Sequence, residues 1–343
     1  MRPAATLTLN TKHDSTPPLI RLLLISLFLI VSTGLSLSLG SFPTSFRQVL
    51  HALLAPQNSD IAFIIWELRL PRIVLAILVG SALAIAGAVL QSIVRNPLAS
   101  PDVIGITSGA SLAAVLFLSL FSATVSIHWL PIAAMTGALA SALLVISLAW
   151  RNGISPSRMV LVGIGLAAAM GAGTTLLIVI SDDSAAMTAY VWLTGSLYAA
   201  QWKDVKGLLP WVVVVIPICF IFARHADVMA LGDNVAEGLG VALLRSRLAL
   251  LACSVVLAGA AVAFAGGISF VGLIAPHLAT KLVGRKLAWL IPASALVGAL
   301  IVLYADLLGR VAFLPKDLPA GIFVAGIGAP FFVYLLHRAR YKG

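Results

Sequence analysis

The sequence predicts an all-α membrane protein with ten transmembrane helices and both termini in the cytoplasm. Three observations lead to this class: the composition, the lengths of the uncharged runs, and the distribution of cations between the loops. Of the 343 residues, 61% are apolar and 10% are charged, against about 45–50% and about 25% in soluble globular domains. This composition excludes a water-soluble fold.

Eight runs without Asp, Glu, Lys or Arg are long enough to matter, because a helix needs about 20 residues to cross a hydrocarbon core of about 30 Å. Six of them have the length of one span: 22–46, 73–94, 159–181, 207–223, 287–305 and 318–337. Two are too long for one crossing: 103–150, which is predicted to break near 126–131, and 248–280, which is predicted to break at Gly266-Gly267. The sequence therefore predicts ten spans.

Two segments have a weaker pattern. The half-run 268–280 is short and carries Pro276 and His277, which predicts a tilted or partly re-entrant helix. The uncharged segment 184–202 mixes hydroxyl and aromatic side chains, a pattern typical of an interfacial helix rather than a lipid-facing one. We expect it to lie outside the membrane, although the sequence leaves open whether part of it is inserted.

The loop charges predict the orientation. With ten spans the termini share a side, and the loops of that side hold 15 of the 22 Lys and Arg residues. By the positive-inside rule this side is cytoplasmic. The formal charge of +10 then follows largely from topology, so nucleic acid is not needed as a partner. The seven cations of the other side are Arg47, Arg69, Arg72, Lys203, Lys206, Arg310 and Lys316.

The chain is predicted to have one membrane domain. Residues 1–18 are polar and form the expected cytoplasmic tail, and residues 19–343 form the ten-helix domain. The first apolar run exceeds the roughly 7–15 residues of a signal-peptide core and lacks an Ala-x-Ala site, so we interpret it as span one. Runs of Gly, Ala and Ser, as at 80–88 and 259–266, predict close helix packing. Cys219 and Cys253 lie in apolar runs and are expected in the core.

Few residues in the spans carry chemistry. Asp306 is the one acid deep in an apolar run, and Arg310 lies four residues on, which predicts a local ion pair. His277 is a candidate ligand or proton carrier but is more simply a structural residue. No Gly-Lys dipeptide occurs, so a phosphate-binding loop is excluded and any ATP hydrolysis must belong to a partner. Two alternatives stay open: a gradient-driven secondary transporter, and an intramembrane enzyme using His277 with Asp306.

The longest internal connection, 224–247, predicts a docking segment. Asp233 or Asn234 can cap a helix, and Gly238 or Gly240 can end one, which predicts two short cytoplasmic helices. Such a protruding segment suits contact with a cytoplasmic protein, although a merely solvated loop is equally consistent with its charges.

Several segments occur in a defined order along the chain: Arg69-Leu-Pro-Arg72, Ala86-Gly-Ala-Val-Leu-Gln91, 95–105 with Gly109-Ala110, Trp192-Leu-Thr-Gly-Ser196, Leu231-Gly-Asp with Leu239-Gly240, 268–277, Ala305-Asp306 with Arg310, and Leu318-Pro-Ala-Gly321 followed by Gly328-Ala-Pro-Phe331. Together these segments resemble the permeases of ABC importers for iron(III) siderophores, haem and vitamin B12. Within this family the sequence looks closest to the ferric enterobactin type, through 149–154 and 100–105. One departure is Asp317, where the family often has Glu.

This resemblance implies a type II ABC importer permease fold in the bacterial inner membrane, with ferric siderophore as the expected cargo and vitamin B12 or haem as alternatives. It implies an ATPase dimer that binds ATP with Mg²⁺, a second permease subunit, different or identical, and a periplasmic or lipid-anchored siderophore-binding protein as partners, and membrane lipid around the spans. No cofactor, catalytic residue, metal ligand or pathway residue is assigned to this chain, and the particular siderophore stays open.

The resemblance also implies two sets of site residues. The residues expected to dock the binding protein are Arg69, Arg72 and Arg310. The residues expected to couple to the ATPase are Leu231, Gly232, Asp233, Ala236, Leu239, Gly240 and Arg245.

Overall fold

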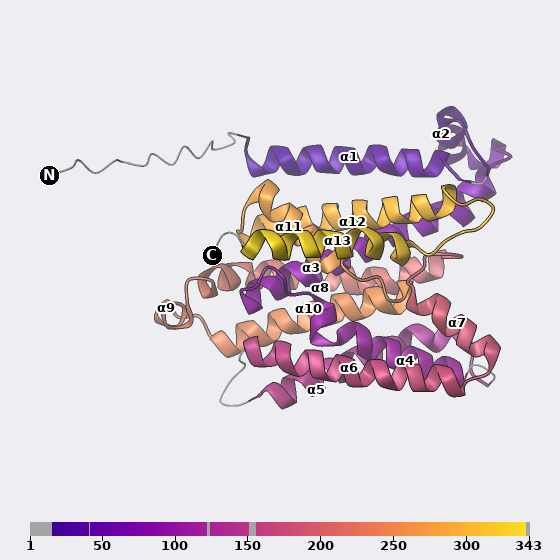
Figure 1. The fold of residues 1–343 in the computed structure, drawn as a ribbon. Coiled ribbons are helices and arrows are strands. Elements are labelled where there is room, and N and C mark those ends of the chain that lie inside the picture. Colours follow the sequence, from indigo (N-terminus) through magenta and orange to yellow (C-terminus); the bar gives the residue numbers. More distant parts are fainter. Residues whose placement is uncertain (1–15, 41, 122–123, 151–155, 341–343) are drawn as a thin grey trace.

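The computed structural model describes residues 16–40, 42–121, 124–150 and 156–340. Within these ranges the fold is all-helical (Figure 1), and most of the expected cytoplasmic tail, 1–15, lies outside them. The α-helices are α1 (Pro18–Ser38), α2 (Phe46–Leu54), α3 (Leu70–Val94), α4 (Ile106–Leu120), α5 (Leu130–Ala149), α6 (Pro156–Ile180), α7 (Asp183–Leu193), α8 (Trp202–Met229), α9 (Asp233–Gly238), α10 (Leu243–Ala265), α11 (Val271–Val283), α12 (Leu287–Val311) and α13 (Ala320–Arg340).

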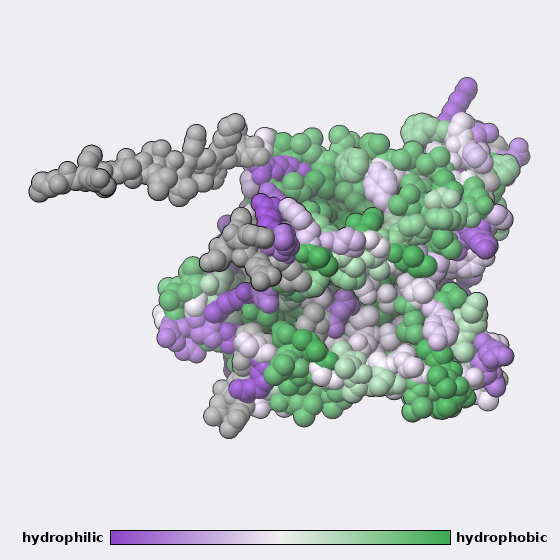
Figure 2. All heavy atoms as spheres, viewed as in Figure 1, coloured by the Kyte–Doolittle hydropathy of each residue, from purple (hydrophilic) through white to green (hydrophobic). Residues whose placement is uncertain are grey.

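Seven of the described helices are long and apolar enough to cross a membrane: α1, α3 with the π-helical turn η2 (Ile64–Arg69) before it, α5, α6, α8, α10 and α12. Three shorter apolar helices accompany them: α4, α11 and the Ala320–Leu335 part of α13. The two predicted breaks are present, one between α4 and α5 and one at the glycines between α10 and α11. Figure 2 shows hydrophobic side chains along the bundle and hydrophilic ones mostly toward its two ends.

Two sequence predictions need correction. The run 22–46 is not one span, because α1 ends at Ser38 and a separate helix, α2, follows with a capping box between Ser45 and Gln48. No charged residue occurs in this turn, so a search for uncharged runs does not separate α1 from α2. The segment 184–202 is likewise not one interfacial helix.

The second part of that segment packs inside the bundle. After α7 ends, the Ser196 amide donates to the Ala265 carbonyl (2.8 Å) and the Gly321 amide donates to the Gly195 carbonyl (3.0 Å). A Cβ on Gly321 would lie 1.9 Å from the Thr194 carbonyl oxygen. Only glycine permits this contact, which places residues 194–200 between the ends of α10 and α13.

Helix α3 is the centre of the packing. Its glycines meet backbone rather than side chains: a Cβ on Gly80 would lie 2.3 Å from the Gly298 oxygen of α12, and one on Gly87 would lie 1.8 Å from the Gly272 oxygen of α11. Small residues let membrane helices approach this closely and gain dispersion contacts. The prediction of close helix packing is thus confirmed at these sites. Helix α3 is largely buried and runs between the two ends of the bundle.

The two ends carry different elements. Helices α2 and α7 lie at one end, here called the α7 end, and α9 lies at the other, the α9 end (Figure 1). The first turn of α1 and the last turn of α13 both lie toward the α9 end. Arg69 and Arg72 stand at the first end of α3 and Arg95 at its last.

Candidate functional site

A buried charge cluster occupies the α7 end of α3. Arg72 donates from Nε to both oxygens of Asp306 (2.8 and 3.1 Å) and from Nη1 and Nη2 to Asp317 (2.6 and 2.8 Å). Asp306 is fully buried in α12, whereas the Asp317 side chain, in the α12–α13 connection, is 26% exposed. Bidentate guanidinium–carboxylate pairing fixes orientation as well as distance. Arg72 therefore holds α3, α12 and that connection together.

The other two arginines hold the end of α1. Arg310 Nε lies 3.2 Å from Asp306, which confirms the predicted ion pair, and its Nη2 donates to the Ser36 hydroxyl (2.6 Å). Arg69 Nη1 donates to the Leu37 carbonyl (2.5 Å) and to Thr44 (3.0 Å), and Nη2 donates to the Phe42 carbonyl. The last carbonyls of a helix have no partner within the helix, so these guanidiniums supply one.

The three predicted docking residues thus lie together, but inside the chain. Arg69, Arg72 and Arg310 are 6%, 7% and 8% exposed. Sequence reasoning missed Asp317, which it noted only as a departure from the family pattern, and the α1 carbonyls, which no sequence signal marks. The cations exposed at this end include Arg47 on α2.

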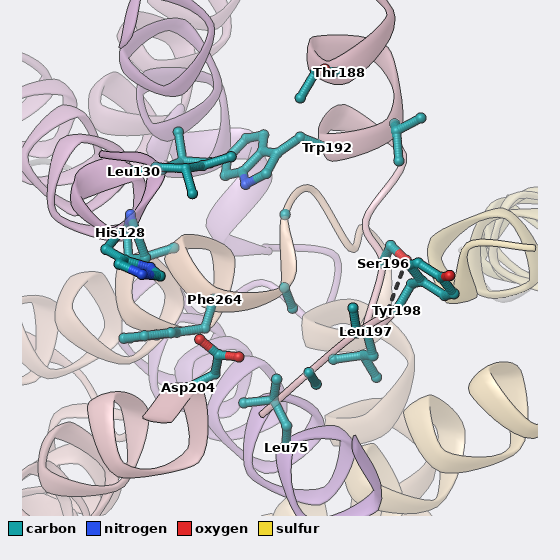
Figure 3. Close-up of a pocket in the computed structure, with 18 of the residues that line it drawn as sticks. Leu75, His128, Leu130, Thr188, Trp192, Ser196, Leu197, Tyr198, Asp204 and Phe264 are labelled. Carbon is teal, nitrogen blue, oxygen red and sulfur yellow. Dashed lines mark hydrogen bonds between the residues drawn. The ribbon is translucent and has the colours of Figure 1, made fainter. Parts of the chain in front are cut away.

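A cavity of about 800 Å³ opens at the same end (Figure 3). Helix α7, the segment 196–200, the short turn η4 (Ile127–Trp129) and the end of α10 enclose it. Its walls are mostly apolar and aromatic, with a few polar groups from Thr188, Ser196, Tyr198 and Asp204. Lys203 Nζ lies 3.4 Å from His128 Nδ1 on one wall. A mostly apolar pocket of this size with few polar groups is typical of small-molecule sites.

The segment 224–247, which the sequence predicts to dock a cytoplasmic partner and which is here called the coupling segment, has one short helix of its own rather than two. Helix α8 continues to Met229, α9 follows, and α10 begins at Leu243. Gly232 precedes α9 at φ +121° and Gly240 follows it at φ +82°, and a Cβ on either would meet open space. These glycines are therefore needed for backbone conformation and not for room.

Asp233 clamps α9 to the bundle. Its carboxylate accepts from Arg247 Nη2 (2.7 and 2.8 Å) and from Arg95 at the last end of α3. The hydrogen bond from Arg247, and then that from Arg95, lower the pKa of Asp233 against the opposing effect of partial burial. These ion pairs join α3 to α9. Helix α3 therefore contacts the charge cluster at its first end and the coupling segment at its last end.

The outer surface of the coupling segment is apolar. Leu231 and Leu239 are 68% and 65% exposed, Val235 between them is also exposed, and Ala236 is buried beneath. Arg245 is exposed in the first turn of α10. Exposed apolar side chains at spacings of four residues are typical of a surface that meets a partner.

The residues of the proposed intramembrane enzyme do not form one site. The His277 ring packs edge-on against Phe331 at a centroid distance of 5.8 Å. Asp306 lies between Arg72 and Arg310. The described part of the chain contains no cluster of three or more His, Cys, Asp or Glu residues that could hold a metal ion. Cys219 and Cys253 are both buried and free, as expected.

Comparison with known proteins assigns the class. The FecCD transport family matches residues 27–338. The chain is 51% identical over 306 residues to the achromobactin transport system permease protein CbrC of Dickeya dadantii, covering 89% of this chain and 88% of that one. It is 40% identical to the Fe(3+) dicitrate transport system permease protein FecD of Escherichia coli (89% and 94% covered) and 36% identical to the ferric enterobactin permease FepG of the same species (92% and 96%).

A solved structure agrees with this assignment. An inward-facing metal-chelate type ABC transporter superposes with a TM-score of 0.82 at 30% identity, covering 93% of this chain and 99% of that one. The chain belongs to the FecCD transport family. It is the permease subunit of an ABC importer and not itself an enzyme.

Proposed function

We propose that this permease carries a ferric siderophore across the bacterial inner membrane, driven by ATP hydrolysis on a partner subunit. The observation that carries the proposal is the match, over 89–95% of this chain, to permeases named for achromobactin and ferric citrate transport. Identity is higher to the achromobactin and ferric dicitrate permeases than to the enterobactin one. We therefore favour a ferric chelate of the achromobactin or citrate kind over one of the enterobactin kind, and over vitamin B12 or haem.

The cavity at the α7 end supports this cargo. Ferric complexes of citrate carry net negative charge. The cavity wall holds one cation, Lys203 beside His128, and one carboxylate, Asp204, which accepts from the Gln201 amide at the start of α8. Aromatic and hydroxyl side chains such as Trp192, Ser196 and Tyr198 suit the organic part of a chelate (Figure 3). We propose that the chelate enters here, with the iron recognised through its chelator.

The orientation follows from the helix ends and the loop charges. We propose that the seven long and three short apolar helices all cross the membrane, which gives ten crossings. An even number agrees with α1 beginning and α13 ending toward the same end of the bundle (Figure 1). The excess of cations in the loops of that side makes the α9 end cytoplasmic.

Each end then has its partner. We propose that Leu231, Val235 and Leu239 of the coupling segment contact the ATPase, which alone binds ATP with Mg²⁺. The siderophore-binding protein docks at the α7 end. A second permease subunit, identical or different, completes the pathway. This chain requires no cofactor of its own in the proposal.

Docking through the three buried arginines requires an exchange of partners. Arg69 and Arg310 bond the end of α1 and the connection after it, and Asp317 is the member of the cluster with a partly exposed side chain. We propose that an acidic residue of the binding protein approaches Arg72 by displacing Asp317, while Arg69 and Arg310 position the surface around it.

A panel of chelates tests the cargo. The purified complex in lipid nanodiscs is given binding protein loaded with ferric citrate, ferric achromobactin, ferric enterobactin, haem or vitamin B12, and ATP hydrolysis is measured. We expect stimulation by the first two, and a reduced response to them in Lys203→Glu. Equal stimulation by vitamin B12 or haem would overturn the cargo assignment.

A further inference from the structure

An apolar groove runs between α1 and the helices α11, α12 and α13. It encloses about 350 Å³ and lies away from the cavity at the α7 end. Its lining includes Phe28, Ile274, Leu308, Ile327 and Phe331. The one hydroxyl in its wall, that of Tyr304, already bonds Ser32 at 2.9 Å. The groove therefore offers an apolar ligand dispersion contacts and almost no hydrogen bonds.

The groove opens sideways, toward the surroundings of the bundle. Phe28, Leu308 and Ile327 stand on its rim and are 52%, 44% and 65% exposed. These residues lie within apolar helices of span character, so the opening faces the hydrocarbon of a bilayer. A single turn of helix, about 10 Å across and about 5.4 Å long, displaces more than 350 Å³, so the groove suits a narrower apolar group, such as part of one flexible acyl chain.

Three cations stand beyond the groove at its α9 end. Each lies seven residues from a lining residue on the same helix: Arg21 from Phe28 on α1, Lys281 from Ile274 on α11, and Arg338 from Phe331 on α13. Residues seven apart share a helix face and are separated by about 10 Å along the axis. All three helices thus place a cation on the face that lines the groove, about two turns closer to the end of the bundle.

The cations converge rather than diverge. Arg21 Nη1 donates to the Leu282 carbonyl (2.5 Å), which brings the start of α1 to the end of α11. The His277 ring of α11 contacts the Phe331 ring of α13 at the groove wall, so the helices that carry Lys281 and Arg338 lie side by side. The α9 end of the groove is therefore flanked by positive charges.

We propose that this groove binds an anionic phospholipid of the leaflet at the α9 end, which is the cytoplasmic one in the orientation given above. One acyl chain lies along Phe28, Ile274 and Ile327, and the phosphate sits among Arg21, Lys281 and Arg338. Clusters of cations between helices at this depth suit acidic headgroups, at about fivefold in affinity for each cation. The lipid then adds contacts between α1, whose apolar side chains are mostly exposed, and the helices α11 and α13.

The test measures lipid retention and needs no transport, so it can fail independently of the proposed function. The purified importer is delipidated in detergent, incubated with phosphatidylglycerol or with phosphatidylcholine of the same chains, and examined by native mass spectrometry. We expect retained phosphatidylglycerol on this chain, and a loss of about 30-fold in its affinity in Lys281→Gln/Arg338→Gln. Phosphatidylcholine binding should not change.

Matched variants separate the two halves of the site. Arg224→Gln/Arg285→Gln removes two exposed cations outside the groove and should have no effect. Ile327→Trp fills the groove and should weaken both lipids, whereas Val333→Trp, which is 64% exposed on the same helix against 65% for Ile327, should weaken neither.

Photo-crosslinking keeps the proposal testable if a variant fails to assemble. A phosphatidylglycerol with a photoreactive chain should label α12 or α13 of the wild-type complex at groove residues. Equal retention of the two lipids, indifference to Lys281→Gln/Arg338→Gln or Ile327→Trp, labelling elsewhere, or displacement by inorganic phosphate at the lipid's own concentration would each overturn it.

Discussion

Arg72 and Asp306 lie 234 positions apart in the chain and form a buried ion pair, with Arg72 Nε 2.8 Å from Oδ1 of Asp306. The pair joins α3 to α12, and the last turn of the same α3 reaches Asp233 of the coupling segment through Arg95. Helix α3 therefore contacts both the α7 end and the α9 end of the bundle, where the two partners are proposed to bind.

Removing Asp306 should destabilise the permease far more than removing Asp317. Asp306→Asn removes the negative charge that pairs with the buried guanidiniums of Arg72 and Arg310. Breaking a buried ion pair costs about 3–5 kcal/mol. Asp317 is partly exposed, so we expect Asp317→Asn to cost about 1 kcal/mol. Thermal unfolding in detergent, followed by size-exclusion chromatography, compares the two. Similar losses in both variants would contradict the structural role given to Asp306.

Gly87→Ala should prevent correct packing of α3 on α11. The added Cβ would lie 1.8 Å from the Gly272 oxygen, and since that neighbour is backbone, the helices must separate. We expect a loss of about 3 kcal/mol in stability, at the upper end of the usual cost of overpacking, or failure to assemble. Gly171→Ala is the control, because a Cβ there meets nothing within 4 Å. Normal yield and thermal stability of Gly87→Ala would show that the approach of α3 to α11 is wrong.

Gly240→Val should weaken the association of the permease with the ATPase. Its φ of +82° strains a β-branched residue, by about 1–3 kcal/mol, and this distorts the connection that presents Leu239. Gly238→Val adds the same bulk in equally open space without a positive φ. Co-purification of the ATPase should fall in Gly240→Val and Gly232→Val and persist in Gly238→Val. Undiminished assembly and uptake in both of the first two would reject the coupling assignment.

The clamp on α9 should persist at neutral pH and fail only in acid. Because the hydrogen bond from Arg247 holds the pKa of Asp233 below its ordinary value of about 3.9, the clamp contributes stability above that value. The contribution is lost as the pH falls through the folded-state pKa. Hydrogen exchange of α9 in Asp233→Asn should rise at pH 7 by less than about fivefold, because solvent screens this exposed pair. Unchanged exchange would show that the clamp does not restrain α9.

The rate at which the siderophore-binding protein associates with the permease tests the proposed displacement of Asp317 from Arg72. Charge reversal at Arg69 or Arg310 would slow docking but would also leave a carboxylate against the α1 carbonyls, so a loss there is ambiguous. Asp317→Asn frees Arg72 without burying a new charge, and we expect faster association with the binding protein, an effect that shrinks with salt. Arg47→Glu serves as the exposed control. A slower rate in Asp317→Asn would contradict the exchange.

Much of this organisation could be predicted from the sequence, because the bilayer imposes length and polarity on every span. The breaks near 126–131 and at Gly266-Gly267, and the pairing of Asp306 with Arg310, are confirmed. The turn after Ser38 and the inward path of 194–200 could not be predicted, since uncharged polar residues make both. The burial of Arg69 and Arg72 also could not be predicted, because their partners are carbonyls and two carboxylates from distant segments.

The most direct test of the central claim is uptake of radioactive iron, supplied as ferric citrate or achromobactin, into proteoliposomes holding the permease and its partner ATPase. The account predicts accumulation only when the loaded binding protein is outside and ATP with Mg²⁺ is inside. Uptake by the permease alone under a proton or sodium gradient, with no need for ATP or binding protein, would contradict it.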